Sequence, residues 1–238
     1  MTYLGPYELD SIITGDAREL AKAIPDESVD LVLTDPPFGI GFNYGNGYKD
    51  DPATYLDLVR WIVAESSRVI KPGGLCFVFV AQPQLRHVWP LFPDDSRIFA
   101  ACKSWVQMRP TAVQYSYDPV IFWQKDKRVW SGRDWHVAKP AHTDKTKANY
   151  VDFHDCPRPL DTIMYMVQNW SEPGDVVVDW FMGSATTAVA AKILHRHWLG
   201  FEIDPDTAER ARQRVLTTQA PLVFPEHEQL TFDTTAAS

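Results

Sequence analysis

Short apolar runs alternate with amphipathic stretches along most of this 238-residue chain. The runs at 29–34, 75–80, 175–179 and 198–202 predict strands, and 75–80 is continuously apolar, which is typical of a strand buried on both faces of a sheet. Residues 52–70 instead carry apolar side chains at helical spacing. Strands that alternate with helices predict an α/β fold of Rossmann-like, doubly wound form, with a mostly parallel sheet covered by helices on both faces.

The same pattern predicts the rest of the fold. We expect a strand over 11–14 and an antiparallel pair of strands near 99–107 and 119–124. Further helices are expected over 17–24, 83–91, 157–169, 184–195 and 205–217. Residues 125–150 show no clear periodicity, so no regular element is predicted there. Ligands of such sheets bind at the carboxyl ends of the strands, and the site is expected at that edge.

The composition narrows the class of protein. Hydrophobic residues make up 45% of the chain and nine are tryptophan, which favours a folded domain over a disordered one. The apolar runs are far too short to span a membrane, and no export signal precedes them, so we expect a cytoplasmic protein. Three cysteines, Cys76, Cys102 and Cys156, are widely spaced, and even with His154 beside Cys156 no metal site is predicted.

The tetrapeptide Asp35-Pro36-Pro37-Phe38 follows the apolar run 29–34 directly. Two prolines fix their own φ angles and form a rigid, extended turn at the mouth of the strand. The turn presents a carboxylate, a backbone carbonyl and an aromatic face. An exocyclic amine on a flat ring needs two acceptors and a surface to stack on, so these residues are the candidate catalytic group.

A second motif lies far along the chain. The run 176–179 ends in Asp179 and is followed by Gly183-Ser184-Ala185-Thr186 and an Ala-rich helical stretch. A strand, a glycine turn and a helix N-terminus cradle nucleotide-like cofactors in doubly wound sheets. The next strand ends in Glu202, at roughly the 20-residue spacing from the turn that suits an acid on a ribose.

Four acids, Asp16, Asp35, Asp179 and Glu202, each follow or end a separate predicted strand. Gathered on one edge of a sheet, they would repel one another unless cationic or hydroxyl partners arrive. The four acids therefore indicate that a ligand with such groups binds at this edge.

These motifs resemble the S-adenosylmethionine-dependent amino-methyltransferases of DNA, in the circularly permuted class whose catalytic motif precedes the cofactor motif. Their motifs read Asp-Pro-Pro-Tyr and Asp-Pro-Phe-x-Gly-Ser-Gly-Thr-Thr, and 157–160 resembles their Lys-Pro helix. The resemblance covers most of 10–80 and 150–215. It implies a DNA-methylating enzyme of the restriction-modification kind that uses S-adenosylmethionine and flips its target base out of the duplex.

The resemblance also implies roles for individual residues. Asp35 and the Pro36 carbonyl would accept from the target amine, and Phe38 would stack on the base beside Pro37. The cofactor would be held by Asp16 at its adenine, by Glu202 at its ribose and by a turn that Asp179 anchors. Its methionine end would be lined by Phe181, Gly183, Ser184 and Thr186.

The chain departs from the family pattern at Trp180, Ala185 and Arg158, where Pro, Gly and Lys are usual. Adenine N6 is favoured because Asp opens the catalytic motif, and cytosine N4 remains an alternative. Methylation of RNA or of a protein amide also stays open, as does a catalytically silent nucleic-acid-binding partner.

The stretch 125–147 holds seven basic residues against three acidic ones, a net charge of +4, which leaves −12 for the rest of a chain whose total is −8. We therefore expect a DNA-contacting segment beside the target pocket, with phosphates held by basic side chains. The candidates are Lys125, Lys127, Arg128, Lys145 and Lys147. A segment this short reads few base pairs by itself or works with a second subunit, so a homodimer stays open.

The chain is therefore expected to be one domain in four parts. These are a catalytic half over 1–124, a basic insertion for target recognition over 125–150, a cofactor-binding half over 151–220 and a tail over 221–238.

Overall fold

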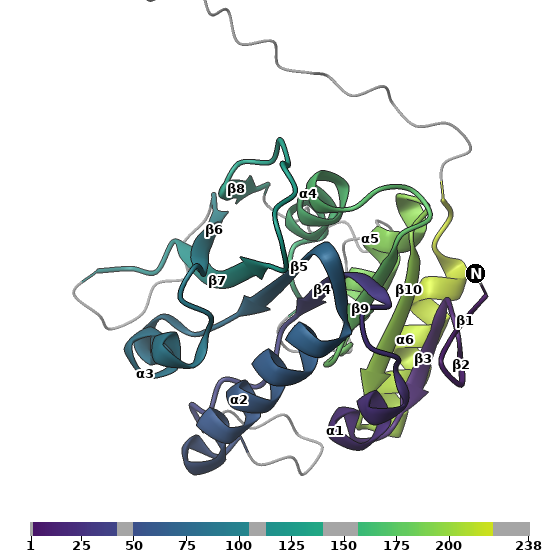
Figure 1. Cartoon of the computed structure of the whole chain (residues 1–238), viewed down its shortest axis with the longest axis horizontal. Helices are drawn as coiled ribbons and strands as arrows, with labels where there is room; N and C mark the ends of the chain where they lie inside the picture. Colours follow the sequence, from purple (N-terminus) through teal and green to yellow (C-terminus); the bar gives the residue numbers. More distant parts are fainter. Residues whose placement is uncertain (1, 42–49, 105–112, 140–156, 221–238) are drawn as a thin grey trace, which may run out of the picture.

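The seven predicted strands and one further strand form an eight-stranded sheet between two layers of helices in the computed structural model (Figure 1). The structure describes residues 2–41, 50–104, 113–139 and 157–220. The predicted α/β class and doubly wound form are confirmed.

Neighbouring strands of the sheet follow the order β3-β10-β9-β4-β5-β7-β6-β8. The first five strands are parallel, whereas β7 runs antiparallel to both β5 and β6. β8 pairs parallel with β6 at the edge. Their bounds are β3 Ser11–Thr14, β10 His197–Glu202, β9 Val176–Asp179, β4 Val29–Thr34, β5 Ile70–Phe79, β7 Tyr117–Gln124, β6 Arg97–Lys103 and β8 Trp135–Ala138.

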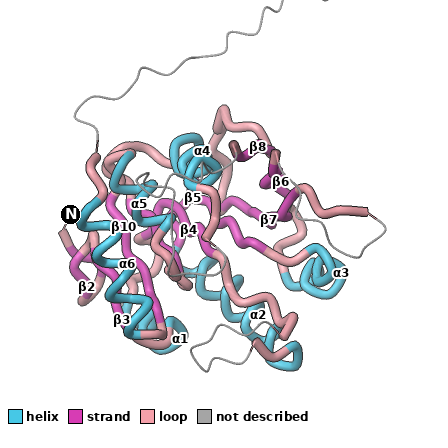
Figure 2. The backbone as a smooth tube through the Cα atoms, turned by 180° about the vertical axis from the view of Figure 1, so that it is seen from behind, coloured by secondary structure: helices cyan, strands magenta, loops and turns pink. Residues whose placement is uncertain are grey.

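Helices cover the two faces of the sheet because strand side chains alternate between them. One face packs under α4 (Leu160–Trp170), α5 (Thr186–Ile193) and α6 (Pro205–Thr217), with Leu31, Leu33 and Phe77 among the buried residues. The other face packs under α1 (Ala17–Leu20), α2 (Pro52–Val69) and α3 (Leu85–Val88), through Val32, Cys76 and Val78. Figure 2 shows these helices around the sheet from behind.

Several predicted elements need correction. The helix expected over 83–91 is three short pieces, a 3-10 turn at Gln82–Gln84, α3, and a 3-10 turn at Trp89–Leu91. Pro83 and Pro90 each lack an N–H, so a continuous helix would lose hydrogen bonds there. Expected helix 17–24 is similarly split into α1 and the 3-10 turn Ala21–Ala23.

Three strands were not expected. β1 (Tyr3–Leu4) and β2 (Tyr7–Glu8) form a separate hairpin, and β8 lies within the stretch that shows no periodicity. β8 thus makes part of the predicted insertion an edge strand of the main sheet. Among the described residues, no helix is long and apolar enough to cross a membrane.

Candidate active site

All four predicted acids lie at the carboxyl ends of four adjacent strands. Glu202 and Asp179 are the last residues of β10 and β9, Asp35 directly follows β4, and Asp16 follows β3 by two residues. The strand order reverses between β9 and β4, which is where doubly wound sheets bind ligands. The structure therefore brings the two motifs, far apart in sequence, to one edge.

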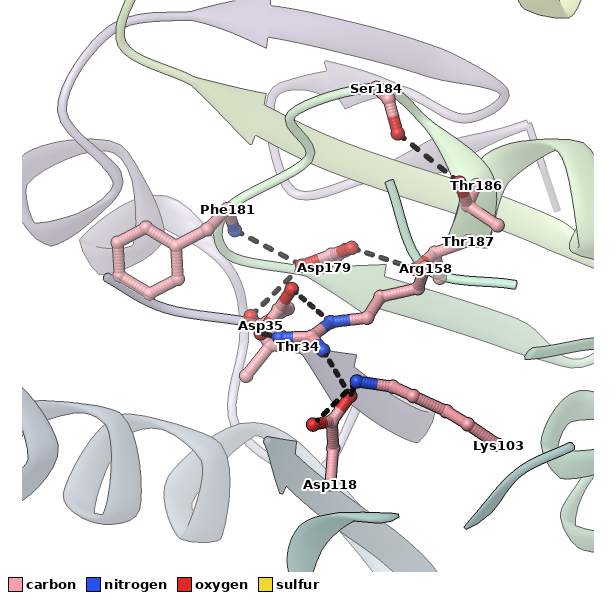
Figure 3. Close-up of polar contacts among 10 residues, drawn as sticks. All are labelled: Thr34, Asp35, Lys103, Asp118, Arg158, Asp179, Phe181, Ser184, Thr186 and Thr187. Atoms are coloured by element: carbon pink, nitrogen blue, oxygen red, sulfur yellow. Dashed lines mark hydrogen bonds and ion pairs between the residues drawn. The ribbon is translucent and has the colours of Figure 1, made fainter. Parts of the chain in front are cut away.

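Asp179 joins the two motifs through buried hydrogen bonds (Figure 3). Its carboxylate accepts from the Thr34 hydroxyl at 2.9 Å, from the Thr187 hydroxyl at 2.8 Å and from the Phe181 amide at 3.1 Å. It thus fixes the end of β4 to the start of α5. Burial raises the pKa of Asp179 to about 7, against the lowering effect of these three donors.

The raised pKa gives a pH dependence of stability. Because the folded state holds the Asp179 proton more tightly than the unfolded chain does, its stabilisation is lost as pH rises through about 7. From about pH 5.5 to about pH 8 this group should lower the free energy of unfolding by on the order of 2 kcal/mol. Urea titrations across this pH range should show a smaller fall in the free energy of unfolding for Asp179→Asn than for the wild type. Equal falls in both proteins would contradict the assignment.

The glycine turn after β9 is held by Glu202 and by its own hydroxyls. One Glu202 oxygen accepts from the Gly183 amide and the other from the Asp204 amide, both at 2.9 Å. Burial raises the pKa of the Glu202 carboxyl. Ser184 and Thr186 are buried, and their hydroxyls lie 3.2 Å apart. The predicted residues of the cofactor loop therefore form one connected cluster.

Asp35 is paired with a residue for which no role is predicted. The Arg158 guanidinium donates from Nε to Asp35 Oδ2 at 2.6 Å and from Nη2 to Oδ1 at 2.7 Å. Its third nitrogen donates to Asp118 at 2.7 Å, and Lys103 pairs with Asp118 at 2.9 Å. Figure 3 shows Lys103, Asp118, Arg158 and Asp35 in one chain of contacts.

The loop after Phe38 is held by Asp50, just before α2, and packs against Tyr55 of α2. Asp50 accepts from the Gly39 amide at 2.6 Å and from the Ile40 amide at 2.9 Å. A side chain at Gly39, whose φ is +63°, would come within 2.4 Å of Tyr55 Cβ, so only glycine lets the loop pack so closely. These contacts fix the turn that presents Asp35.

The profile of the DNA methylase family, N6_N4_Mtase, matches residues 29–213, a span that includes Asp35, the glycine turn and Glu202. The chain belongs to this family. The match confirms the resemblance seen in the two motifs, and their order in this methylase is the permuted one.

Two curated relatives of this methylase are also named methyltransferases. It is 26% identical to the DNA adenine methyltransferase YhdJ of Escherichia coli, over 87% of this chain and 83% of that protein. It is 27% identical to the type II methyltransferase M.BglII of Bacillus subtilis, over 86% of this chain and 68% of that protein.

Solved structures show the same fold. The M1.HpyAVI–SAM complex superposes with a TM-score of 0.65 at 21% identity, covering 86% of this chain and 98% of that one. The cytosine-N4-specific PvuII DNA methyltransferase superposes with a TM-score of 0.68 at 19% identity, covering 88% and 93%. These likenesses confirm the α/β architecture.

Two other predicted cofactor residues of the methylase, Asp16 and Phe181, make contacts that were not predicted. Asp16 caps α1 and pairs with Arg18 at 2.7 Å, and the pair's hydrogen bonding lowers the pKa of Asp16. The Phe181 ring packs edge-on against Trp61 of α2, 6.3 Å between centroids, and points away from Ser184 in Figure 3. The group that Phe181 contributes to the turn is its backbone amide, which donates to Asp179.

The departures from the family pattern have different consequences. Trp180 is buried, donates to Ser66 at 2.9 Å and stacks on Phe201, so it belongs to the core under α2. Ala185 has φ +65° and ψ +31°, a left-handed conformation that costs an L-residue roughly 1–2 kcal/mol. The usual glycine avoids that cost, so Ala185 strains the turn before α5.

The predicted position of the basic segment is wrong for Lys125, Lys127 and Arg128. Because β7 runs antiparallel to β5, it carries them away from Asp35 to the opposite edge of the sheet, and Figure 1 shows the loop after β7 rising there. Lys125 pairs with Glu27 at 3.0 Å, and Arg128 pairs with Glu172 at 3.3 Å. The candidates Lys145 and Lys147 lie outside the described residues, as do His154 and Cys156.

The described residues contain no cluster of three or more His, Cys, Asp or Glu side chains that could hold a metal ion. Cys76 is buried and Cys102 half-buried, and neither lies among the residues of the site.

Proposed function

We propose that this DNA methylase transfers a methyl group from S-adenosylmethionine to the N6 amine of an adenine flipped out of double-stranded DNA. The observation that carries the proposal is the buried Thr34–Asp179 hydrogen bond, which ties the Asp35 turn to the glycine turn across the switch point of the sheet. A donor bound on one side and an amine bound on the other would meet there.

The target amine is a poor nucleophile because its lone pair is delocalised into the ring. Asp35 and the Pro36 carbonyl would accept hydrogen bonds from its two N–H groups and draw the lone pair out of the ring plane, while Phe38 stacks on the base beside Pro37. Catalysis is then alignment and electrostatic stabilisation at a preorganised site. No cysteine nucleophile is required, since the methyl group goes to an exocyclic nitrogen.

The cofactor has a matching set of groups along the same edge. Asp16 would accept from the adenine amine, and Glu202 would hold the ribose hydroxyls with its remaining lone pairs. The methionine carboxylate would meet the N-terminus of α5, beside Gly183, Ser184 and Thr186. The bound group supplies an activated methyl. Structures of two relatives in this fold, including one from Thermus thermophilus, contain the same cofactor.

Adenine is the proposed target because Asp opens the catalytic motif and the Escherichia coli relative is named an adenine methyltransferase. Cytosine N4 is the second candidate, since the PvuII enzyme of that specificity shares the fold. Sequencing of modified bases in DNA from cells that express the chain decides between them and gives the recognition site. N6-methyladenine at a defined sequence is expected, and N4-methylcytosine would overturn the adenine assignment.

We further propose that DNA phosphates are contacted at the carboxyl edge, where Lys139 follows β8. Lys139 is exposed, and its neighbour Ala138 pairs with Lys103. Lys139→Gln should weaken DNA binding, and the salt slope of log K should become shallower by roughly 0.9.

The matched control is the triple variant Lys125→Gln, Lys127→Gln, Arg128→Gln, which removes three cations from the opposite edge. Its DNA affinity and salt slope should stay unchanged in fluorescence-anisotropy titrations. If the triple variant loses affinity while Lys139→Gln does not, DNA binds at the amino edge and this placement is wrong.

A further inference from the structure

The Arg158 guanidinium contacts the same groups that the proposed target base would contact. We propose that Arg158 is a resident stand-in for the flipped base, which the base must displace, and that Asp118 retains Arg158 after displacement. The inference rests on the proposed function and assigns two positioning residues to it.

The contacts of Arg158 match those proposed for the amine. Two of its N–H groups donate to both oxygens of Asp35, at 2.6 and 2.7 Å. Its Cζ lies 5.5 Å from the centroid of the Phe38 ring and 4.7 Å from that of Phe79, both within cation–π range. A flat N–H donor therefore already lies against the carboxylate and the aromatic face that the base requires.

Asp118 is placed to take over the cation. It precedes Pro119 near the start of β7, at the same edge as Asp35, and accepts from Arg158 Nη1 at 2.7 Å. Lys103 contacts both oxygens of Asp118, Oδ2 at 2.9 Å and Oδ1 at 3.0 Å. The Arg158 side chain is only 16% exposed, so losing its carboxylate partner altogether would leave a nearly buried charge unpaired. With Asp118 already bound, Arg158 can release Asp35 without that penalty.

The movement is confined to the Arg158 side chain. The residue stands between Pro157 and Pro159, and a following proline restricts it to extended backbone. Pro159 has φ −58° and caps the start of α4. A rotation of the side-chain torsions can thus exchange Asp35 for Asp118 while the helix and the glycine turn stay in place.

The exchange has a defined kinetic consequence. A base that donates to Asp35 must compete with the bidentate guanidinium, so the competition weakens productive DNA binding more than it slows the methyl transfer itself. A lysine has one nitrogen and cannot hold both oxygens in the same planar way. A lysine at this position should therefore be easier to displace.

The test compares Arg158→Lys, Asp118→Asn and the double variant in steady-state methylation of a duplex carrying the site found by modified-base sequencing. Arg158→Lys should lower the KM for DNA several-fold with kcat nearly unchanged. Asp118→Asn should raise the KM several-fold, and this increase should largely disappear in the double variant. Arg128→Lys, an ion-paired arginine that lies 3.9 Å over the Trp130 ring at the opposite edge, is the matched control and should change neither constant.

A second measurement does not depend on turnover. A duplex with 2-aminopurine at the target position reports unstacking of the base by its fluorescence. The bound signal should rise for Arg158→Lys and fall for Asp118→Asn, with thermal unfolding confirming that both variants are folded.

Active variants that lose kcat while the KM and the fluorescence stay unchanged would overturn the inference, because Arg158 would then be a permanent support for Asp35. A wild-type chain that methylates no DNA would overturn the proposed function itself.

Discussion

Asp35→Ala should abolish most methyl transfer while cofactor affinity stays within a few-fold of wild type. The carboxylate is proposed to accept a hydrogen bond from the target amine, and loss of one preorganised acceptor costs on the order of a hundred- to a thousand-fold in rate. Single-turnover transfer of labelled methyl groups into DNA measures the first quantity, and calorimetry with S-adenosylmethionine measures the second.

Two controls sharpen this result. Asp35→Asn keeps the shape of the side chain but replaces an acceptor with a donor, so it should be nearly as inactive as the alanine variant. Arg158→Lys leaves Asp35 in place and should stay active, although its ion pair is altered. Near-normal turnover by Asp35→Ala would show that the catalytic assignment is wrong.

Glu202→Ala should weaken S-adenosylmethionine binding strongly. Charge-assisted hydrogen bonds are each worth roughly 1.5–3 kcal/mol, and the proposed contact to the ribose makes two of them. The same carboxylate accepts from the amides of Gly183 and Asp204, so its removal also loosens the glycine turn. Calorimetry measures the affinity, and Glu209→Ala, an exposed acid on α6, is the control that should bind normally.

Glu202→Gln separates the two contributions. It fills the same space and can still accept from Gly183 through its amide oxygen, although its NH2 group cannot accept from the Asp204 amide, so the glycine turn should keep one of its two hydrogen bonds while the charge is lost. An affinity between those of wild type and Glu202→Ala is expected. Unchanged affinity in both variants would refute the ribose role.

The edge that carries the site could be predicted because its signals are local. An apolar run that ends in an acid gives both the strand and the position of the carboxylate, and β4 has the predicted bounds, Val29–Thr34. Given parallel strands, Asp16, Asp35, Asp179 and Glu202 had to meet at one edge.

The partners of Asp35 could not be predicted in this way. Arg158 lies 123 positions from Asp35 along the chain, and its contact depends on how α4 meets the carboxyl edge. The Arg158-Pro159 pair stood out only as a departure from the family pattern. Nor does sequence reveal the left-handed backbone of Ala185, since alanine usually avoids it.

The location of the basic residues could not be predicted for a different reason. Charge composition identifies a cationic segment but not the direction of the strand that leads into it. Because β7 is antiparallel, Lys125 and Arg128 emerge at the amino edge, whereas β8 returns the chain to the carboxyl edge at Lys139. β8 is short and has two exposed apolar residues, Trp135 and Val137, so its sequence shows no clear strand pattern.

Whether this edge of the sheet methylates the exocyclic amine of adenine in DNA is decided by mass spectrometry of nucleosides, after unmethylated bacterial DNA is incubated with the protein and S-adenosylmethionine. The wild-type chain should yield N6-methyladenine, and Asp35→Ala should yield almost none. Methylation on a ring carbon, or equal yields from the wild type and Asp35→Ala, would contradict the proposed function.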